Sequence, residues 1–92
     1  MKIIVREKAA ADLDALFEWI AQDNPLAATN MVARIVERIN LLAATGLAHM
    51  GRAGLVRGTR ELVEPPYIIV YEVDEDRDEI AVLAIIHGAR NR

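Results

Sequence analysis

Five polar side chains in the second half of the sequence have types suited to chemistry: Arg57, Arg60, Glu61, His87 and Arg90. An imidazole or a carboxylate can move a proton, and guanidinium groups can hold phosphate oxygens or developing negative charge. Together they could in principle cleave a phosphodiester. Arg60 and Glu61 are adjacent in a strand-like run, however, so their side chains should point to opposite faces and cannot form a side-by-side pair.

His87 follows the apolar run Ile80–Ile86 and has two interpretations. In the first, which we favour, it is a structural residue at the exit of a buried strand, hydrogen-bonded to a backbone group. In the second, it is a rim residue that contacts a target or acts as a general acid. Gly88, the next residue, suits a tight turn in either case.

The same region supplies most of the residues that could contact a protein partner. Guanidinium groups form forked hydrogen bonds with carboxylates, and Trp is over-represented among interface anchors. Structural alternatives remain open: Arg52 and Arg57 as a solvated loop, Arg60 in a salt bridge to the helices or the terminal segment, and Trp19 at the edge of the core. The candidate partner-binding residues are Trp19, Arg52, Arg57, Arg60, His87 and Arg90.

Composition excludes several classes of function. Lys and Arg number 11 against 14 Asp and Glu, and the formal net charge of −3 weighs against nucleic-acid binding through global charge. The sequence has no Cys and only 2 His, so we expect no disulfide, metal site or cofactor. No signal peptide or membrane-spanning run is evident, which favours a soluble, cytoplasmic protein. We expect one domain over residues 1–92.

Two helices are predicted before residue 45. A first helix from Ala9 has an apolar stripe at helical spacing, and a second runs from Pro25 to about Ala44 with Asn24 as its N-cap. So short a link makes them an antiparallel hairpin. The first helix's stripe comprises Leu13, Leu16, Phe17 and Ile20.

Four strands are predicted around this hairpin: Lys2–Arg6, Val56–Val63, Tyr67–Val73 and Ile80–His87. The last is apolar at nearly every position, so we expect it inside the sheet with both faces buried. The helices need an apolar surface to cover, and the sheet is the only large one available. The predicted fold is therefore α+β, with two layers in the order β-α-α-β-β-β and a mostly antiparallel sheet.

Several segments in this order resemble the ParE branch of the ParE/RelE toxin superfamily. They are Gly51-Arg52-x-Gly54, Gly58-Thr59-Arg60-Glu61-Leu62, Pro66-Tyr67-Ile68-Ile69-Val70-Tyr71 and His87-Gly88-Ala89-Arg90. The resemblance covers essentially the whole sequence. It implies the toxin of a type II toxin–antitoxin module, held in a hetero-oligomer by a cognate ParD-like antitoxin, with DNA contacted only through the antitoxin and no membrane partner.

The superfamily includes two activities. ParE-like members inhibit DNA gyrase, whereas RelE-like members cleave messenger RNA on the ribosome with a cluster of Lys and Arg, often with a Tyr near the C-terminus. This sequence has no Lys after Lys8 and no aromatic residue after His87. We therefore expect a non-enzymatic gyrase inhibitor. One alternative is a ribosome-dependent endoribonuclease using His87, Arg57, Arg60 and Arg90; another is a degenerate toxin that only binds antitoxin.

The antitoxin could be bound in two ways. An extended segment could add a strand to one of the sheet edges, or an amphipathic helix could lie in a groove beside the helical hairpin. The sequence alone does not distinguish these modes.

Overall fold

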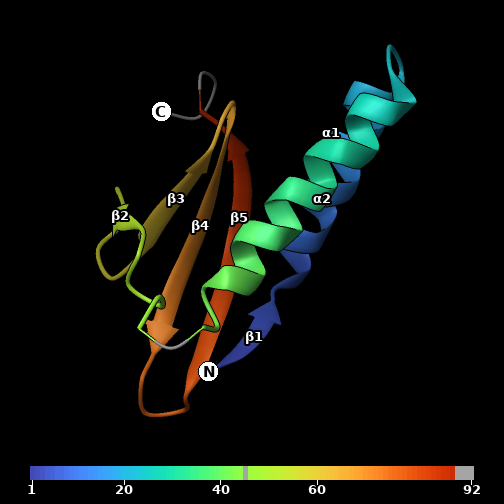
Figure 1. Ribbon diagram of the computed structural model, residues 1–92. Helices are drawn as coiled ribbons and strands as arrows, with labels where there is room; N and C mark the ends of the chain where they lie inside the picture. The colour runs from blue at the N-terminus through green and yellow to red at the C-terminus, as the bar shows by residue number, and fades with distance from the viewer. Residues whose placement is uncertain (45, 89–92) are drawn as a thin grey trace.

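The computed structural model describes residues 1–44 and 46–88 of the 92-residue sequence. Two antiparallel helices, α1 (Glu7–Ala21) and α2 (Pro25–Leu41), form one layer, and a five-stranded sheet forms the other. Figure 1 shows the helical hairpin along one side of the sheet. Helix α1 packs against the last strand, β5 (Glu79–His87). The predicted two-layer α+β fold is confirmed.

The short link between the helices is stabilised by an N-cap and a proline at the start of α2. The Asn24 side chain accepts a hydrogen bond from the backbone N–H of Ala27 at 3.0 Å, which satisfies one of the free amide groups at the start of α2. Pro25 occupies the first turn, where a missing N–H costs nothing. The predicted cap of the second helix is therefore confirmed.

The sheet is mixed, with the order β1-β5-β4-β3-β2. Strand β1 (Lys2–Val5) runs parallel to β5 (Glu79–His87), and the remaining neighbours are antiparallel. Strand β4 (Tyr67–Asp74) pairs with β5 on one side and with β3 (Arg60–Glu64) on the other. At the far edge, β2 (Arg52–Ala53) pairs with β3. Placement of β5 inside the sheet agrees with its apolar sequence.

The hydrophobic core lies between the helices and one face of the sheet. The helices contribute Leu16, Ile35 and Ile39, and the sheet contributes mainly β4 and β5 side chains. Tyr71 and Ile69 of β4 are fully buried. The core thus packs α1 and α2 against the sheet, mainly against β4 and β5.

Three predictions about local structure were wrong. Strand β3 begins at Arg60 rather than Val56, because the preceding residues form a loop, and β2 is a strand that the sequence did not indicate. Phe17 is exposed, since the face of α1 that meets the core is centred on Leu16 and Phe17 lies at its margin. Burial on both faces of β5 holds for Ile80–Val82, while Leu83 and Ala84 are half-buried.

Candidate protein-binding site

Strand β5 extends beyond its parallel neighbour. The register pairs β1 with Glu79–Val82 alone, and a further hydrogen bond runs from the Arg6 N–H to the Val82 carbonyl. Within the described part of the chain, residues 83–87 of β5 therefore have no strand on that side. Such an open edge presents backbone groups that must find other partners.

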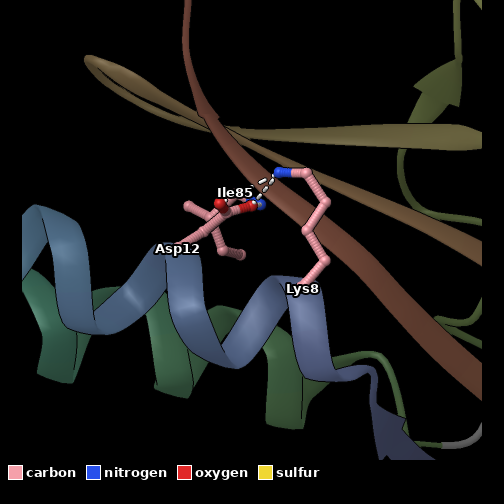
Figure 2. A network of polar contacts seen from close by, with 3 residues as sticks. All are labelled: Lys8, Asp12 and Ile85. Carbon is pink, nitrogen blue, oxygen red and sulfur yellow. Dashed lines mark hydrogen bonds and ion pairs between the residues drawn. The ribbon is translucent and has the colours of Figure 1, made fainter.

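Asp12 of α1 supplies one of those partners. Its carboxylate accepts a hydrogen bond from the Ile85 backbone N–H at 2.9 Å, and Lys8 Nζ donates to both carboxylate oxygens at 2.9 and 2.8 Å. Figure 2 shows Lys8 and Asp12 projecting from α1 toward β5 at Ile85. Charge-assisted hydrogen bonds of this kind are among the stronger ones. The helix thus closes the edge of β5 at this position.

A groove of about 400 Å³ opens beside this contact, between α1 and the end of β5. Its α1 wall is a single helical stripe, because Lys8, Asp12, Ala15 and Trp19 follow one another at intervals of three or four residues. Most of its other residues are apolar or aromatic. They are Leu16, Tyr67, Ile85, Ile86 and His87.

Aromatic groups lie at the far end of the groove. Trp19 is 60% exposed, so much of its large indole lies at the surface. The rings of Tyr67 and His87 meet edge to face, with centroids 5.5 Å apart. Gly88 follows, and its N–H donates to the Pro66 carbonyl at 2.9 Å. The groove therefore combines aromatic walls with a rim that carries Lys8, Asp12 and His87.

The Arg candidates lie at the other side of the sheet. Arg52 of β2 donates to the buried Glu61 carboxylate at 3.3 Å. Arg60 donates to the carbonyls of Gly51 and His49 at 2.8 and 3.2 Å, and among the described residues it makes no salt bridge to the helices. Residues 89–92 of the terminal segment, the other predicted partner, lie outside the described part of the chain. Arg57 is exposed in the β2–β3 loop. Arg90 lies outside the described residues.

The sheet register separates Arg60 from His87. Glu64, Tyr67 and His87 are aligned across β3, β4 and β5, whereas Arg60 is aligned with Tyr71. Arg60 is therefore about 13 Å along the strands and about 10 Å across them from His87. Because the Arg60 guanidinium is also held by two loop carbonyls, these two residues do not form one acid–base group.

Lys8 and Asp12 were not identified from the sequence as residues of interest. A signal was present, since they precede Ala15 and Trp19 on a second helical stripe beside the apolar one. Glu61 was singled out for its carboxylate, but its burial was not predicted, because it depends on the unpredicted strand β2. No group of His, Asp and Glu within residues 1–44 and 46–88 is arranged to hold a metal ion.

Comparison with known sequences identifies the family of this chain. The profile of the family described as the ParE toxin of the type II toxin–antitoxin system parDE matches residues 3–92. The chain belongs to the ParE toxin family. It is thus the toxin of a type II toxin–antitoxin system, and its resemblance to the ParE branch is confirmed.

Relatives of this ParE-family chain span most of its length. It is 37% identical to protein Y4kP of Sinorhizobium fredii over 83 residues, covering 88% of this chain and 81% of that protein. It is 34% identical to toxin RelE2 of Caulobacter vibrioides over 83 residues, with 90% of each covered. The first relative is named only as a putative toxin and the second as a RelE toxin, so the names alone do not specify a target.

Solved structures carry the same fold. A chain of the chromosomal ParDE toxin–antitoxin system from P. aeruginosa is 32% identical with a TM-score of 0.81, and 95% of each chain is covered. A chain of the RelBE2 toxin–antitoxin complex from Mycobacterium tuberculosis has a TM-score of 0.68 over 94% of this chain and 95% of that one, at 20% identity, and shows the fold alone. Neither described helix of the ParE-family chain is long and apolar enough to cross a membrane.

Proposed function

We propose that this ParE-family toxin inhibits DNA gyrase by binding it, without breaking a covalent bond. The separation of Arg60 from His87 carries this proposal, because it divides the set of groups that a ribonuclease mechanism would need. The net charge of −3 adds support, since a ribosome-bound nuclease benefits from a basic surface. The toxin would act in the cytoplasm, alongside gyrase and DNA.

We further propose that the cognate antitoxin binds in the groove between α1 and β5. This partner is a ParD-like protein, which would form a hetero-oligomer with the toxin and make the contacts with DNA. The groove has the properties of a site for an amphipathic helix: apolar walls, the exposed Trp19 as an anchor, and a charged rim at Lys8 and Asp12.

The Asp12–Ile85 hydrogen bond favours a helix over an added strand. A strand pairing with the end of β5 would need the Ile85 N–H, which the Asp12 carboxylate already occupies at 2.9 Å. Displacing this carboxylate would break a charge-assisted hydrogen bond that lies mostly out of water. A helix can instead fill the groove with side chains and leave that bond in place.

Two assays on one protein preparation test the proposed target. Supercoiling of relaxed plasmid by purified gyrase should fall as toxin is added and should recover when antitoxin is added. Primer extension on messages translated in vitro should show no new 5′ ends. Unchanged supercoiling at micromolar toxin, together with new 5′ ends, would assign the ribonuclease activity of the RelE branch.

The similarity to toxin RelE2 is a reason to test the ribonuclease function as well. Substitution of His87, Arg57, Arg60 or Arg90 by Ala would then abolish the new 5′ ends. A protein that binds antitoxin but changes neither assay, and that leaves growth unaffected when expressed alone, would be a degenerate toxin.

A further inference from the structure

The loop between β2 and β3 exposes two adjacent aliphatic side chains. Leu55 is 71% exposed and Val56 is 68% exposed, and both lie at the tip of the β2–β3 hairpin. Single exposed apolar residues are common, but here two such residues are neighbours at the tip of a hairpin and together expose apolar surface to water. This surface is not among the residues that line the α1–β5 groove.

Backbone hydrogen bonds fix the shape of this loop. The Gly54 N–H donates to the Thr59 carbonyl at 2.9 Å, and both the Thr59 N–H and its hydroxyl donate to the Val56 carbonyl at 3.1 and 2.6 Å. Gly58 has a φ of +86°, a conformation that glycine adopts without strain. The loop is therefore ordered before any partner arrives, which reduces the entropy lost on binding.

A buried carboxylate holds the loop from its base. Glu61 of β3 is 3% exposed, and it accepts hydrogen bonds from the Leu55 N–H and from Arg52, each at 3.3 Å. The Leu55 backbone is thus attached to the sheet, while its side chain points to solvent. The buried Glu61 carboxylate thus orders the base of the loop, while the apolar side chains at its tip remain exposed.

The charge of the tip is positive. From His49 to Arg60 the sequence has three Arg and no Asp or Glu, in a protein with a net charge of −3. Arg52 and Arg60 are bound to Glu61 and to loop carbonyls, respectively. Arg57, in contrast, makes no hydrogen bond or ion pair with any other described residue. Its guanidinium is available for an external carboxylate.

We propose that Leu55, Val56 and Arg57 form a docking tip that inserts into an apolar socket on the toxin's protein target, where Arg57 pairs with a carboxylate at the socket's rim. This inference rests on the proposed function, in that the toxin acts by binding a target. A rigid convex tip fits a preformed cavity of a folded protein, whereas a wrapping antitoxin needs the concave groove on the other side of the sheet. Two aliphatic side chains and no aromatic ring favour protein over nucleic acid.

The test compares two variants of the full chain with the wild type. Leu55→Ser/Val56→Ser removes the apolar pair, and Leu26→Ser is the control, because Leu26 is 70% exposed at the start of α2 and away from the loop. We expect the double variant to lose growth inhibition on expression without antitoxin and to need at least about 10-fold more protein to inhibit gyrase. Its affinity for purified antitoxin should stay within about 2-fold of wild type, as should that of the control.

Arg57→Ala tests the charged part of the tip. We expect about a 5-fold to 10-fold loss of target inhibition, partly restored in Arg57→Lys, and only a modest dependence on salt. Circular dichroism and thermal melting of every variant identify any change that comes from unfolding.

Each outcome bears on the inference. Full growth inhibition by Leu55→Ser/Val56→Ser would overturn it, as would a loss of antitoxin affinity that equals the loss of target inhibition. Loss with Arg57→Ala alone, combined with a steep salt dependence, would indicate a nucleic-acid contact instead and also overturn it. In a further outcome, the wild type arrests growth, the double variant does not, and neither protein inhibits gyrase. That result would support the docking tip and contradict the gyrase proposal. A wild-type protein that leaves growth unaffected would overturn both.

Discussion

The Asp12 carboxylate of α1 accepts a hydrogen bond from the Ile85 backbone N–H of β5 at 2.9 Å. It joins the first helix to the last strand at the point where β5 has passed the end of β1. Without it, an N–H in a buried part of the strand would lack a partner. One contact thus serves both the packing of α1 and the closure of a strand edge beside the groove.

Asp12→Ala should therefore destabilise the fold by about 1–3 kcal/mol, the cost of leaving a buried N–H unsatisfied. Lys8→Ala is the matched control. It removes the other partner of Asp12, but Lys8 is largely exposed, and an exposed pair of this spacing contributes only about 0.3–0.5 kcal/mol. Urea denaturation of the three proteins measures the difference. Equal stability of the two variants would show that the Ile85 hydrogen bond contributes little.

Trp19→Ala should weaken antitoxin binding without changing the fold. Loss of an aromatic residue that anchors a partner costs at least about 2 kcal/mol, or about 30-fold in Kd. Leu26→Ala, another exposed apolar residue on the helical hairpin, should leave Kd within about 2-fold. Calorimetric titration with antitoxin measures both. An unchanged Kd for Trp19→Ala would place the antitoxin elsewhere on the toxin.

Glu61→Ala should loosen the β2–β3 loop. The substitution removes the acceptor of the Leu55 N–H and the partner of Arg52, from a position that is 3% exposed. We expect a loss of about 1–3 kcal/mol in stability and faster hydrogen exchange at the Leu55 amide. Arg52→Ala, which leaves the Leu55 hydrogen bond intact, should change the exchange rate little. Equal protection of Leu55 in both variants would contradict this account of the loop.

Gly51→Ala should be poorly tolerated. A Cβ at this position would lie 2.7 Å from the Glu61 carbonyl oxygen and 2.8 Å from the Tyr71 hydroxyl, distances that require the backbone to move. We expect a loss of about 1–3 kcal/mol, as for other overpacked sites.

Tyr71→Phe separates the steric effect from the lost hydrogen bond. The Gly51 N–H donates to the buried Tyr71 hydroxyl at 2.9 Å, so this variant should lose about 1–2 kcal/mol. Adding Gly51→Ala to it should still be costly, since the Glu61 carbonyl remains in place. Thermal melting of the single and double variants tests both expectations, and a harmless Gly51→Ala would contradict the close contact.

Long periodic segments made the fold predictable. Asn24-Pro25 marked the start of α2, and the apolar runs around Ile69 and Val82 identified the two central strands, because periodicity and caps are local properties of the sequence. Strand β2 has two residues and exists because it pairs with Glu61 and Arg60. A strand of two residues is too short to show a periodic pattern, so the sequence did not indicate it.

The candidate site was predictable in part. Trp19 and His87 were identified from their residue types, and the structure places both in the α1–β5 groove. The carbonyl partners of Arg60 were not predicted, since their positions depend on the loop conformation. Asp12 was passed over because its role depends on where β1 ends relative to β5, a property of the assembled sheet.

A supercoiling titration is the most direct test of whether this toxin acts on gyrase by binding, as proposed. Purified gyrase, relaxed plasmid and ATP are incubated with increasing toxin, and then with toxin preincubated with antitoxin. We expect progressive loss of supercoiling as toxin is added and full recovery at one antitoxin-binding equivalent. Supercoiling that stays unchanged at micromolar toxin, in a preparation that still binds antitoxin, would contradict it.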